Sequence, residues 1–286
     1  MQNSFKYKVI QYYAVIFYIL MMYKWLNDSF LYQLEPSFFY TRKDLFTWFF
    51  MQTGLHQWLL NNPPGWIMLD ILFYSMPMLY LILFLYKKST SVVIVVLMLL
   101  INWCYVQCYT LYPSNSIEGH IAWLFFPFLF LANDEKTFKL LFEGLRYFFL
   151  YFFVSAGIWK LVQGGVFNLA EMSGVLLYQH NQLLSSSPGY WQTDLISYLV
   201  LHTQLSYFLY LSATLLELFF IIGFFTKKYD RFLAILFVLF LIADYYLMRI
   251  PYFELTPLLL TLLLKPSEDA EINSSTFVEN RLKSGS

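Results

Sequence analysis

Residues 91–112 read SVVIVVLMLLINWCYVQCYTLY, a run long enough to cross a bilayer that contains no charged side chain. A second uncharged run, ILFYSMPMLYLILFLY, covers residues 71–86. Only α-helices and closed β-barrels satisfy every backbone hydrogen bond in lipid, and barrel strands alternate polar and apolar residues over about ten positions. Because both runs are continuously apolar, they predict membrane-spanning helices.

The composition of the whole chain agrees with a bundle of such helices. Of its 286 residues, 59% are hydrophobic and 13% are charged, whereas soluble domains carry about 25% charged residues. We therefore expect an all-α, polytopic membrane protein whose first partner is the lipid bilayer. The 18 basic and 18 acidic residues give zero net charge, which leaves no electrostatic basis for binding nucleic acid.

The apolar runs predict about eight spans, with additional interfacial helices, in a single domain over residues 1–265. A polar, disordered tail is expected at 266–286. The run at 195–225 is either one long tilted helix or a helix with an interfacial foot, which is a short segment that lies flat at the membrane surface. The segment 137–146 carries polar residues at helical spacing and is expected to lie flat on the membrane as an amphipathic foot. The eight predicted spans are 9–26, 66–86, 91–112, 119–133, 140–162, 195–225, 231–248 and 251–264.

The distribution of Lys and Arg predicts the direction of the spans. Cytoplasmic loops carry an excess of these residues, and an even number of spans places both termini on one side. With both termini in the cytoplasm, the outer segments hold only Arg42, Lys43 and Arg249. The inner segments then hold Lys6, Lys8, Lys87, Lys88, Lys136, Lys139, Arg146, Lys227, Lys228, Arg231 and Lys265.

Ionisable residues inside apolar spans are the candidates for function, because each costs at least about 2.5 kcal/mol to insert. Lys160 follows an almost wholly apolar stretch and lies near the outer end of its predicted span. A poorly hydrated lysine acts as a base near neutral pH, whereas a lysine at a span end also extends its amine to the lipid headgroups. Both interpretations of Lys160 remain open. The other candidates are Lys24, Asp70, His120, Glu217 and Asp244.

The predicted hairpin of the fourth and fifth spans places His120 near Lys160. His120 begins one arm, and the two arms have similar lengths, about 18 and 20 Å, if the foot at 137–146 lies flat. His120 is otherwise an interfacial histidine bonded to a neighbour. Glu217 and Asp244 have no partner nearby in the sequence, so each is expected to pair with a cation from another span. Asp244 alternatively joins the outer polar cluster.

Metal and thiol chemistry have weaker signals. The four histidines lack HxxxH or HxxE spacing, so no metal site is predicted. Cys104 and Cys108 share one face of a helix, but their spacing differs from the CxxC redox motif. We expect these cysteines to pack in the core.

The stretch Val154-Ser155-Ala156-Gly157-Ile158-Trp159-Lys160-Leu161, followed by Gly164-Gly165-Val166-Phe167, resembles the vitamin K-dependent γ-carboxylase family. It also resembles the wider bacterial group of horizontally transferred transmembrane domains, in which a helix ends in Ala-Gly-x-x-Lys-Leu. The likeness covers most of residues 1–265. Further similar segments are Asn115 through His120 to Leu124, Tyr178-Gln179-His180, Leu215-Leu216-Glu217-Leu218 and the span from Phe232 to Phe253.

The resemblance implies a specific site. In the carboxylases, the lysine that Lys160 matches acts as base toward reduced vitamin K. The oxygenated quinol then takes a proton from a peptide glutamate, and carbon dioxide adds to the glutamate. By this likeness, Lys160 is the base and His120 its partner, on the outer side. Asp244 departs from the family, which commonly has histidine there. The residues expected around the quinone are Trp159, His180, Glu217 and Asp244.

Three functions follow from these features. The first is an enzyme that uses a reduced, menaquinol-like quinone and acts on a peptide or protein. The second is a non-enzymatic subunit or assembly partner within a larger membrane complex. The third is a small quinone oxidoreductase that uses Cys104 and Cys108.

Overall fold

The computed structural model describes residues 4–34, 45–87, 92–112, 120–186, 189–250 and 252–266. The predicted tail beyond residue 266, the outer cations Arg42 and Lys43, and the segment 113–119 lie outside these described residues. All regular structure in the described part is helical, as predicted. The α-helices are α1 (Phe5–Leu26), α2 (Leu45–Gln52), α3 (Leu55–Asn61), α4 (Pro64–Lys87), α5 (Val92–Thr110), α6 (Ile121–Phe125), α7 (Glu135–Val162), α8 (Glu171–Ser186), α9 (Trp191–Leu201), α10 (Thr203–Phe219), α11 (Ile222–Phe225), α12 (Asp230–Met248) and α13 (Leu260–Leu263), and the 3₁₀ helices are η2 (Phe126–Leu131), η3 (Gly165–Phe167) and η4 (Phe253–Leu259).

Six stretches of the described chain are long and apolar enough to cross a membrane. They are α1, α4, α5, α7, α10 with α11, and α12. The predicted spans 119–133 and 251–264 are instead the shorter apolar segments Ile121–Leu131 and Phe253–Leu263. Both contain 3₁₀ helix with a proline, Pro127 in η2 and Pro257 in η4, which removes a backbone donor from the regular α-helical pattern.

The predicted amphipathic foot at 137–146 is wrong, because α7 is one continuous helix from Glu135 to Val162. Asp134 caps this helix by accepting a hydrogen bond from the Thr137 amide, and its contacts with the Thr137 hydroxyl and amide lower the pKa of the Asp134 carboxyl. Arg146 belongs to this segment, which was expected to lie flat on the membrane. Arg146 is buried, since Asp230 of α12 and the Gly223 carbonyl accept hydrogen bonds from its guanidinium.

The run at 195–225 is interrupted, which excludes the single long helix. The chain leaves helical geometry at His202, and this break separates α9 from α10. A second interruption at Phe220 and Ile221 separates α10 from α11.

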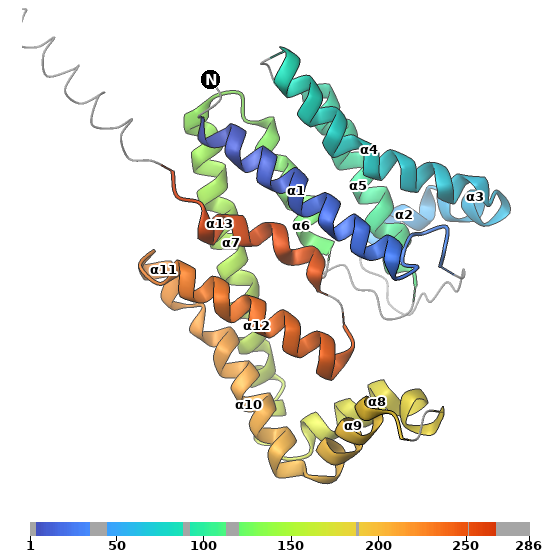
Figure 1. Ribbon diagram of the computed structural model, residues 1–286, viewed down its shortest axis with the longest axis vertical. Coiled ribbons are helices and arrows are strands. Elements are labelled where there is room, and N and C mark those ends of the chain that lie inside the picture. Colours follow the sequence, from blue (N-terminus) through green and yellow to red (C-terminus); the bar gives the residue numbers. More distant parts are fainter. Residues whose placement is uncertain are drawn as a thin grey trace, which may run out of the picture.

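Contacts at the two ends of α1 show the direction of the two short apolar segments, α6–η2 and η4–α13 (Figure 1). At one end, the Lys6 ammonium donates to the Ala132 carbonyl, which follows η2. At the other end, Lys24 lies 2.8 Å from Glu254 at the start of η4, and His120 at the start of α6 lies beside the same carboxylate. The α6–η2 segment therefore runs antiparallel to α1. The η4–α13 segment starts at the same end and also packs along α1.

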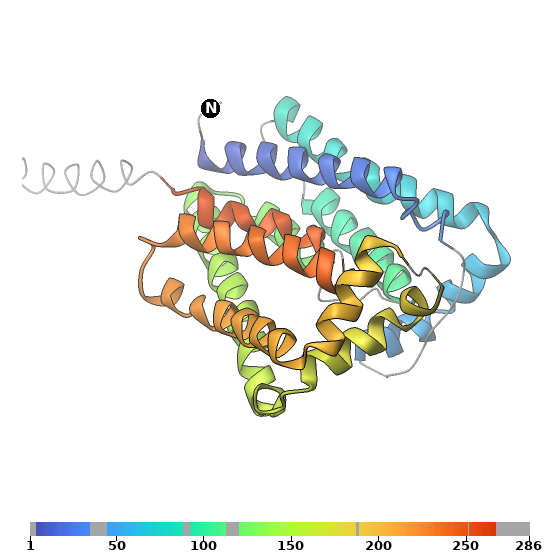
Figure 2. The same cartoon turned by 60° about the horizontal axis from the view of Figure 1, so that its bottom comes forward.

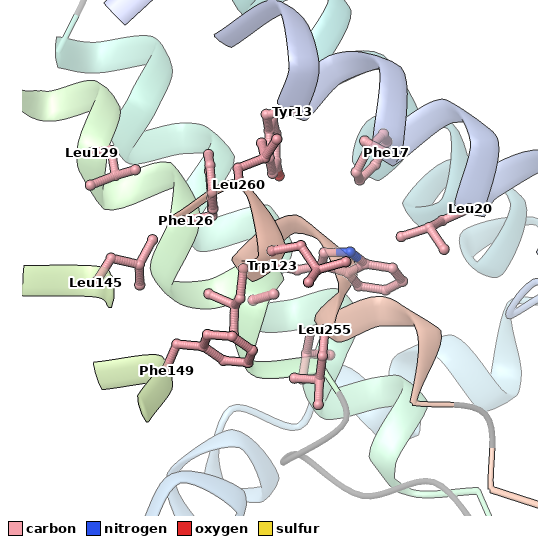
Figure 3. Close-up of a cluster of buried hydrophobic side chains, with 14 of the residues drawn as sticks. Tyr13, Phe17, Leu20, Trp123, Phe126, Leu129, Leu145, Phe149, Leu255 and Leu260 are labelled. Carbon is pink, nitrogen blue, oxygen red and sulfur yellow. The ribbon is translucent and has the colours of Figure 1, made fainter. Parts of the chain in front are cut away.

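The core between these segments combines aromatic rings with leucine side chains (Figure 3). The Tyr13 ring of α1 stacks on Phe126 of η2 with centroids 4.7 Å apart. Trp123 of α6 is fully buried and contacts Phe17 of α1 through its ring. Leu255 of η4 adds to the same cluster. These contacts hold both short segments against α1.

A helical hairpin of α8 and α9 lies at one end of the molecule, next to α10 and α12 (Figures 1 and 2). It has a small core of its own, formed by Met172, Leu176, Ile196 and Leu199. The main core contains none of these four residues. The hairpin core packs against Leu209 and Tyr210 of α10 and against Leu247 and Met248 of α12.

Two glycines of α7 provide a matched test of the contact between α7 and α10. A Cβ atom added at Gly157 would lie 2.9 Å from Leu218 Cγ, whereas one added at Gly144 meets nothing within 4 Å beyond its own turn of helix. We expect Gly157→Ala to lower the free energy of unfolding by about 1–3 kcal/mol through overpacking. Gly144→Ala is expected to raise the same quantity by about 0.5–1 kcal/mol. Thermal unfolding in detergent measures both, and equal effects would contradict the close contact.

Candidate functional site

Lys160 and Glu217 form an ion pair between α7 and α10. The Lys160 Nζ atom lies 2.7 Å from Glu217 Oε1. The two helices come close because Gly157, one turn before Lys160, has no side chain in the way of Leu218. The Lys160 side chain is 26% exposed and that of Glu217 only 4%, so the pair lies at the border of the protein interior. Glu217 thus has the partner from another helix that its position in an apolar span required.

Asp244 of α12 is the third member of this group, which we call the Lys160 cluster. Its carboxylate is close enough to interact electrostatically with both Lys160 and Glu217. Its Oδ2 atom is buried without a hydrogen-bond partner, as is Oε2 of Glu217. A buried acceptor without a donor is costly in free energy. A proton or a bound hydroxyl group at Asp244 would remove this cost.

A cavity of about 250 Å³ borders Asp244 between α8, α10 and α12. Most of its wall is apolar, with Leu209 and Leu216 from α10, Phe240 from α12 and Met172 from α8. Asp244 is the one ionisable side chain among the described residues that line this cavity. The polar side chains in this otherwise apolar wall are those of Asp244 and Ser212. Ligand pockets in proteins commonly combine an apolar wall with a few polar groups.

His120 belongs to a different group, the Lys24 cluster, which also contains Lys24 and Glu254. Glu254 Oε1 lies 2.8 Å from Lys24 Nζ and 3.8 Å from His120 Nε2. All three side chains are no more than 6% exposed. His120 and Lys160 therefore have separate carboxylate partners, Glu254 and Glu217, where the sequence predicted one shared site.

Aromatic rings surround the Lys24 cluster. The Lys24 ammonium lies 3.9 Å from the centroid of the Tyr109 ring and 5.4 Å from that of Trp123. A cation over an aromatic face is attracted by the negative charge of that face. The Lys24 cluster thus joins the ends of α1 and α5 to the starts of α6 and η4, and its burial favours a structural role.

Asp70 is held in a neighbouring network at the start of α4. It accepts hydrogen bonds from the amides of Leu31 and Tyr32 and from the Tyr74 hydroxyl. Tyr74 in turn lies 2.9 Å from the Tyr105 hydroxyl of α5. Because three donors satisfy the Asp70 carboxylate, it anchors the segment after α1 to the bundle.

The remaining predicted residues lie at different distances from the cavity. His180 Nε2 is 2.7 Å from the Leu247 carbonyl, and Leu247 lines the cavity one turn after Asp244. Trp159 is 59% exposed on the outer surface of α7. Cys104 and Cys108 are free thiols, and Cys108 is buried.

Glu254 was missed by the sequence interpretation. It stands as the only acidic residue in the apolar run 250–264, and the rule that singled out Glu217 and Asp244 applies to it equally. Its partner, Lys24, was recognised as an ionisable residue that is costly to insert into lipid, but it had no assigned role. Within the described residues, no group of three or more His, Cys, Asp and Glu side chains is placed to hold a metal ion.

Comparison with known proteins gives no further assignment. No protein-family model, curated protein or solved structure matches the chain. Contacts and burial therefore distinguish the two clusters. The Lys24 cluster is enclosed by aromatic rings, whereas the Lys160 cluster borders a cavity. Both clusters contain carboxylate oxygens without hydrogen-bond partners, Oε2 of Glu254 in the first and Oε2 of Glu217 and Oδ2 of Asp244 in the second.

The structural role of the Lys24 cluster can be tested by removing its charges singly and together. Lys24→Met and Glu254→Gln are each expected to lower the free energy of unfolding by about 3–5 kcal/mol, because each leaves a buried charge uncompensated. The double substitution is expected to cost clearly less than the sum. Thermal unfolding in detergent measures all three proteins.

The exposed pair of Lys227 and Glu143 is the matched control, with the Lys227 side chain 49% exposed. Lys227→Met is expected to change the free energy of unfolding by no more than about 1 kcal/mol. Additive effects of the two substitutions in the Lys24 cluster would contradict a stabilising buried pair.

Proposed function

We propose that the chain is an integral membrane enzyme that binds a reduced isoprenoid quinone and transfers a proton at the Lys160 cluster. The observation that carries this proposal is the buried Asp244 Oδ2 atom, which has no hydrogen-bond partner beside an apolar cavity. The ion pair of Lys160 and Glu217 lies next to it and supplies further groups that exchange protons. When bound, the reduced quinone would supply a ring hydroxyl and two electrons.

The cavity suits the ring of such a molecule. Its volume of about 250 Å³ is just below the roughly 300–1,000 Å³ of pockets that enclose whole drug-sized ligands. It therefore takes a ring, while an isoprenoid tail continues between α10 and α12 into the lipid. Asp244 accepts a hydrogen bond from a ring hydroxyl, and Met172 and Met248 add polarisable contacts.

The Lys160 cluster supplies both an acceptor and a base. Asp244 accepts a proton from a hydroxyl in the cavity. Lys160 Nζ and Glu217 Oε1 lie 2.7 Å apart, so one proton can pass from the lysine to the carboxylate and leave a neutral amine and a neutral acid. The neutral amine is the base that the resemblance to the γ-carboxylases assigns to Lys160.

Carboxylation of a peptide glutamate is the reaction that the resemblance adds to this proposal. The partly exposed Lys160 gives a peptide access from the end of the bundle. His120 lies at the same end, since Tyr23 beside Lys24 interacts with Tyr245 beside Asp244.

We further propose that the chain crosses the membrane eight times, with both termini in the cytoplasm and the Lys160 cluster outside. The contact of Lys6 with Ala132 supports this number, because α6–η2 then returns the chain to the end where α1 begins. A 3₁₀ helix rises about 2.0 Å per residue, so η2 and η4 cover more depth than α-helices of equal length. The Lys265 ammonium donates to the Lys227 carbonyl, so two lysines lie together at the end that we assign to the cytoplasm. The positive-inside rule expects such cations on the cytoplasmic face.

Thiol labelling of intact cells distinguishes eight crossings from six. In a background with Cys104→Ala and Cys108→Ala, a membrane-impermeant maleimide is expected to label Tyr178→Cys and to leave Lys136→Cys unlabelled until the cells are opened. With six crossings, in which α6–η2 and η4–α13 do not cross, the two positions exchange sides. Labelling of Lys136→Cys in intact cells would therefore contradict the proposed topology.

Copurified quinone tests the proposed function. Mass spectrometry of the purified protein is expected to detect an isoprenoid quinone. Asp244→Leu is expected to reduce the amount bound by at least about tenfold, because a hydrogen bond to a charged group contributes about 1.5–3 kcal/mol. Lys160→Met is expected to retain the quinone and lose its turnover.

The exposed Asp194 of α9 offers a matched control, and Asp194→Leu is expected to leave bound quinone unchanged. Wild-type protein without quinone, or Asp244→Leu with the wild-type amount, would contradict the assignment of this cavity.

A further inference from the structure

A second cavity lies between α5 and the short helices α2 and α3, and it shares no wall residue with the cavity beside Asp244. We call it the Cys104 groove. It is open on one side and has a volume of about 440 Å³, within the roughly 300–1,000 Å³ of known ligand pockets. Its wall includes Phe50 of α2, Trp58 of α3, and Trp103 and Cys104 of α5. Among the described residues that line it, none is charged, so the groove suits an apolar ligand.

Side-chain contacts hold α2 against α5 beside the Cys104 groove. The fully buried Phe50 meets the Trp103 ring edge-on, with the ring centroids 5.8 Å apart. One turn further along α5, Gln107 Oε1 accepts a hydrogen bond from the Thr47 hydroxyl at 3.3 Å. The next helix, α3, packs on both α2 and α4 (Figure 1). Packed helices therefore frame the groove on two sides.

An exposed apolar stripe on α5 leads into the Cys104 groove. Val93, Val96 and Leu100 are 42–68% exposed and recur at the spacing of one helical face. Trp103 and Cys104 continue this face by one more turn. Because α5 is long and apolar enough to cross a membrane, its exposed stripe faces lipid chains. The groove is thus continuous with a surface that lipid covers.

The outer faces of α2 and α3 are apolar as well. Leu45, Phe46 and Phe49 of α2 are 58–74% exposed. The segment 45–69, which contains both helices, has no Asp, Glu, Lys or Arg. Short apolar helices of this kind lie in the boundary between headgroups and acyl chains, where Trp is also enriched. Lipid is therefore the neighbour of α2 and α3 at the mouth of the groove.

Cys104 lies at the depth of lipid chains. It precedes Thr110, the last residue of α5, by six residues, which corresponds to about 9 Å along the helix axis. The 19 residues of α5 extend over about 28 Å, close to the roughly 30 Å thickness of the hydrocarbon layer. A position 9 Å from the end of α5 therefore lies within this layer by the same rise per residue, at roughly the depth of the first methylene groups.

We propose that the Cys104 groove binds one acyl chain of a bilayer phospholipid, whose headgroup lies at the level of α2 and α3. A phospholipid is the apolar molecule already present at this depth, and the stripe on α5 places its chain between Trp58 and Trp103. The site has no residue in common with the Lys160 cluster. This inference therefore holds or fails independently of the proposed quinone chemistry.

Native mass spectrometry of the full chain tests this site. Wild-type protein in mild detergent, incubated with dioleoylphosphatidylcholine, is expected to retain one phospholipid. Trp58→Ala is expected to lower the retained fraction at least about threefold, because it removes apolar surface that the chain buries. Trp48→Ala is the matched control, since Trp48 is 46% exposed against 47% for Trp58 but does not line the groove. The control is expected to retain the wild-type amount.

The reaction of Cys104 with N-ethylmaleimide gives a second measurement. In the Cys108→Ala variant, Cys104 is the single thiol of the chain. Addition of dioleoylphosphatidylcholine to this variant in detergent is expected to slow the reaction at least about threefold, because only the lipid-free fraction reacts. This measurement leaves the wall of the groove intact, so it decides the question if Trp58→Ala fails to fold.

Three results would overturn the proposal. The first is wild-type protein that retains no phospholipid or retains another apolar molecule in its place. The second is an equal loss in Trp58→Ala and Trp48→Ala, which would indicate lipid bound over the whole apolar surface. The third is a Cys104 labelling rate that added phospholipid leaves unchanged.

Discussion

Ion pairs between buried side chains determine which helices of this bundle become neighbours. Lys24 pairs with Glu254, Arg146 with Asp230, and Lys160 with Glu217, at distances from 2.6 to 2.8 Å. An unpaired charge in an apolar interior costs several kcal/mol, so each pair fixes which helices become neighbours. These pairs join α1 to η4, α7 to α12, and α7 to α10, segments that lie far apart in the sequence. Asp244 stands next to the third pair with no cation of its own, and the proposed proton transfer rests on this additional acid.

Hydropathy predicted the helices well because burial in lipid is a property of each segment alone. The long apolar runs, such as 91–112, correspond to described helices, and the break near residue 202 agrees with one of the two alternatives for 195–225. The foot at 137–146 failed for a physical reason. Polar residues at helical spacing indicate a face that needs polar contacts, and water or a buried carboxylate satisfies that need equally well. For Arg146 the contact is Asp230, from a helix 84 residues away.

The candidate site was only partly predictable, because the sequence does not show which distant helices come into contact. The cost of inserting a charge identified Lys160, Glu217 and Asp244 individually, but their grouping depends on how α7, α10 and α12 pack. Depth along the membrane placed His120 level with Lys160. Two residues at equal depth can face different helices, and His120 faces Glu254. The cavity itself has no sequence signal, because its wall residues are ordinary apolar positions of three helices.

The proposed function depends on Asp244, which would bind the ring hydroxyl of a reduced quinone in the cavity between α8, α10 and α12. The most direct measurement is an electron cryomicroscopy structure of the full chain in nanodiscs that contain a menaquinol. We expect density for the ring against Phe240 and Leu216, with a ring oxygen within about 3 Å of the Asp244 carboxylate. A quinone ring bound elsewhere on the protein, with Asp244 bonded only to protein groups, would contradict it.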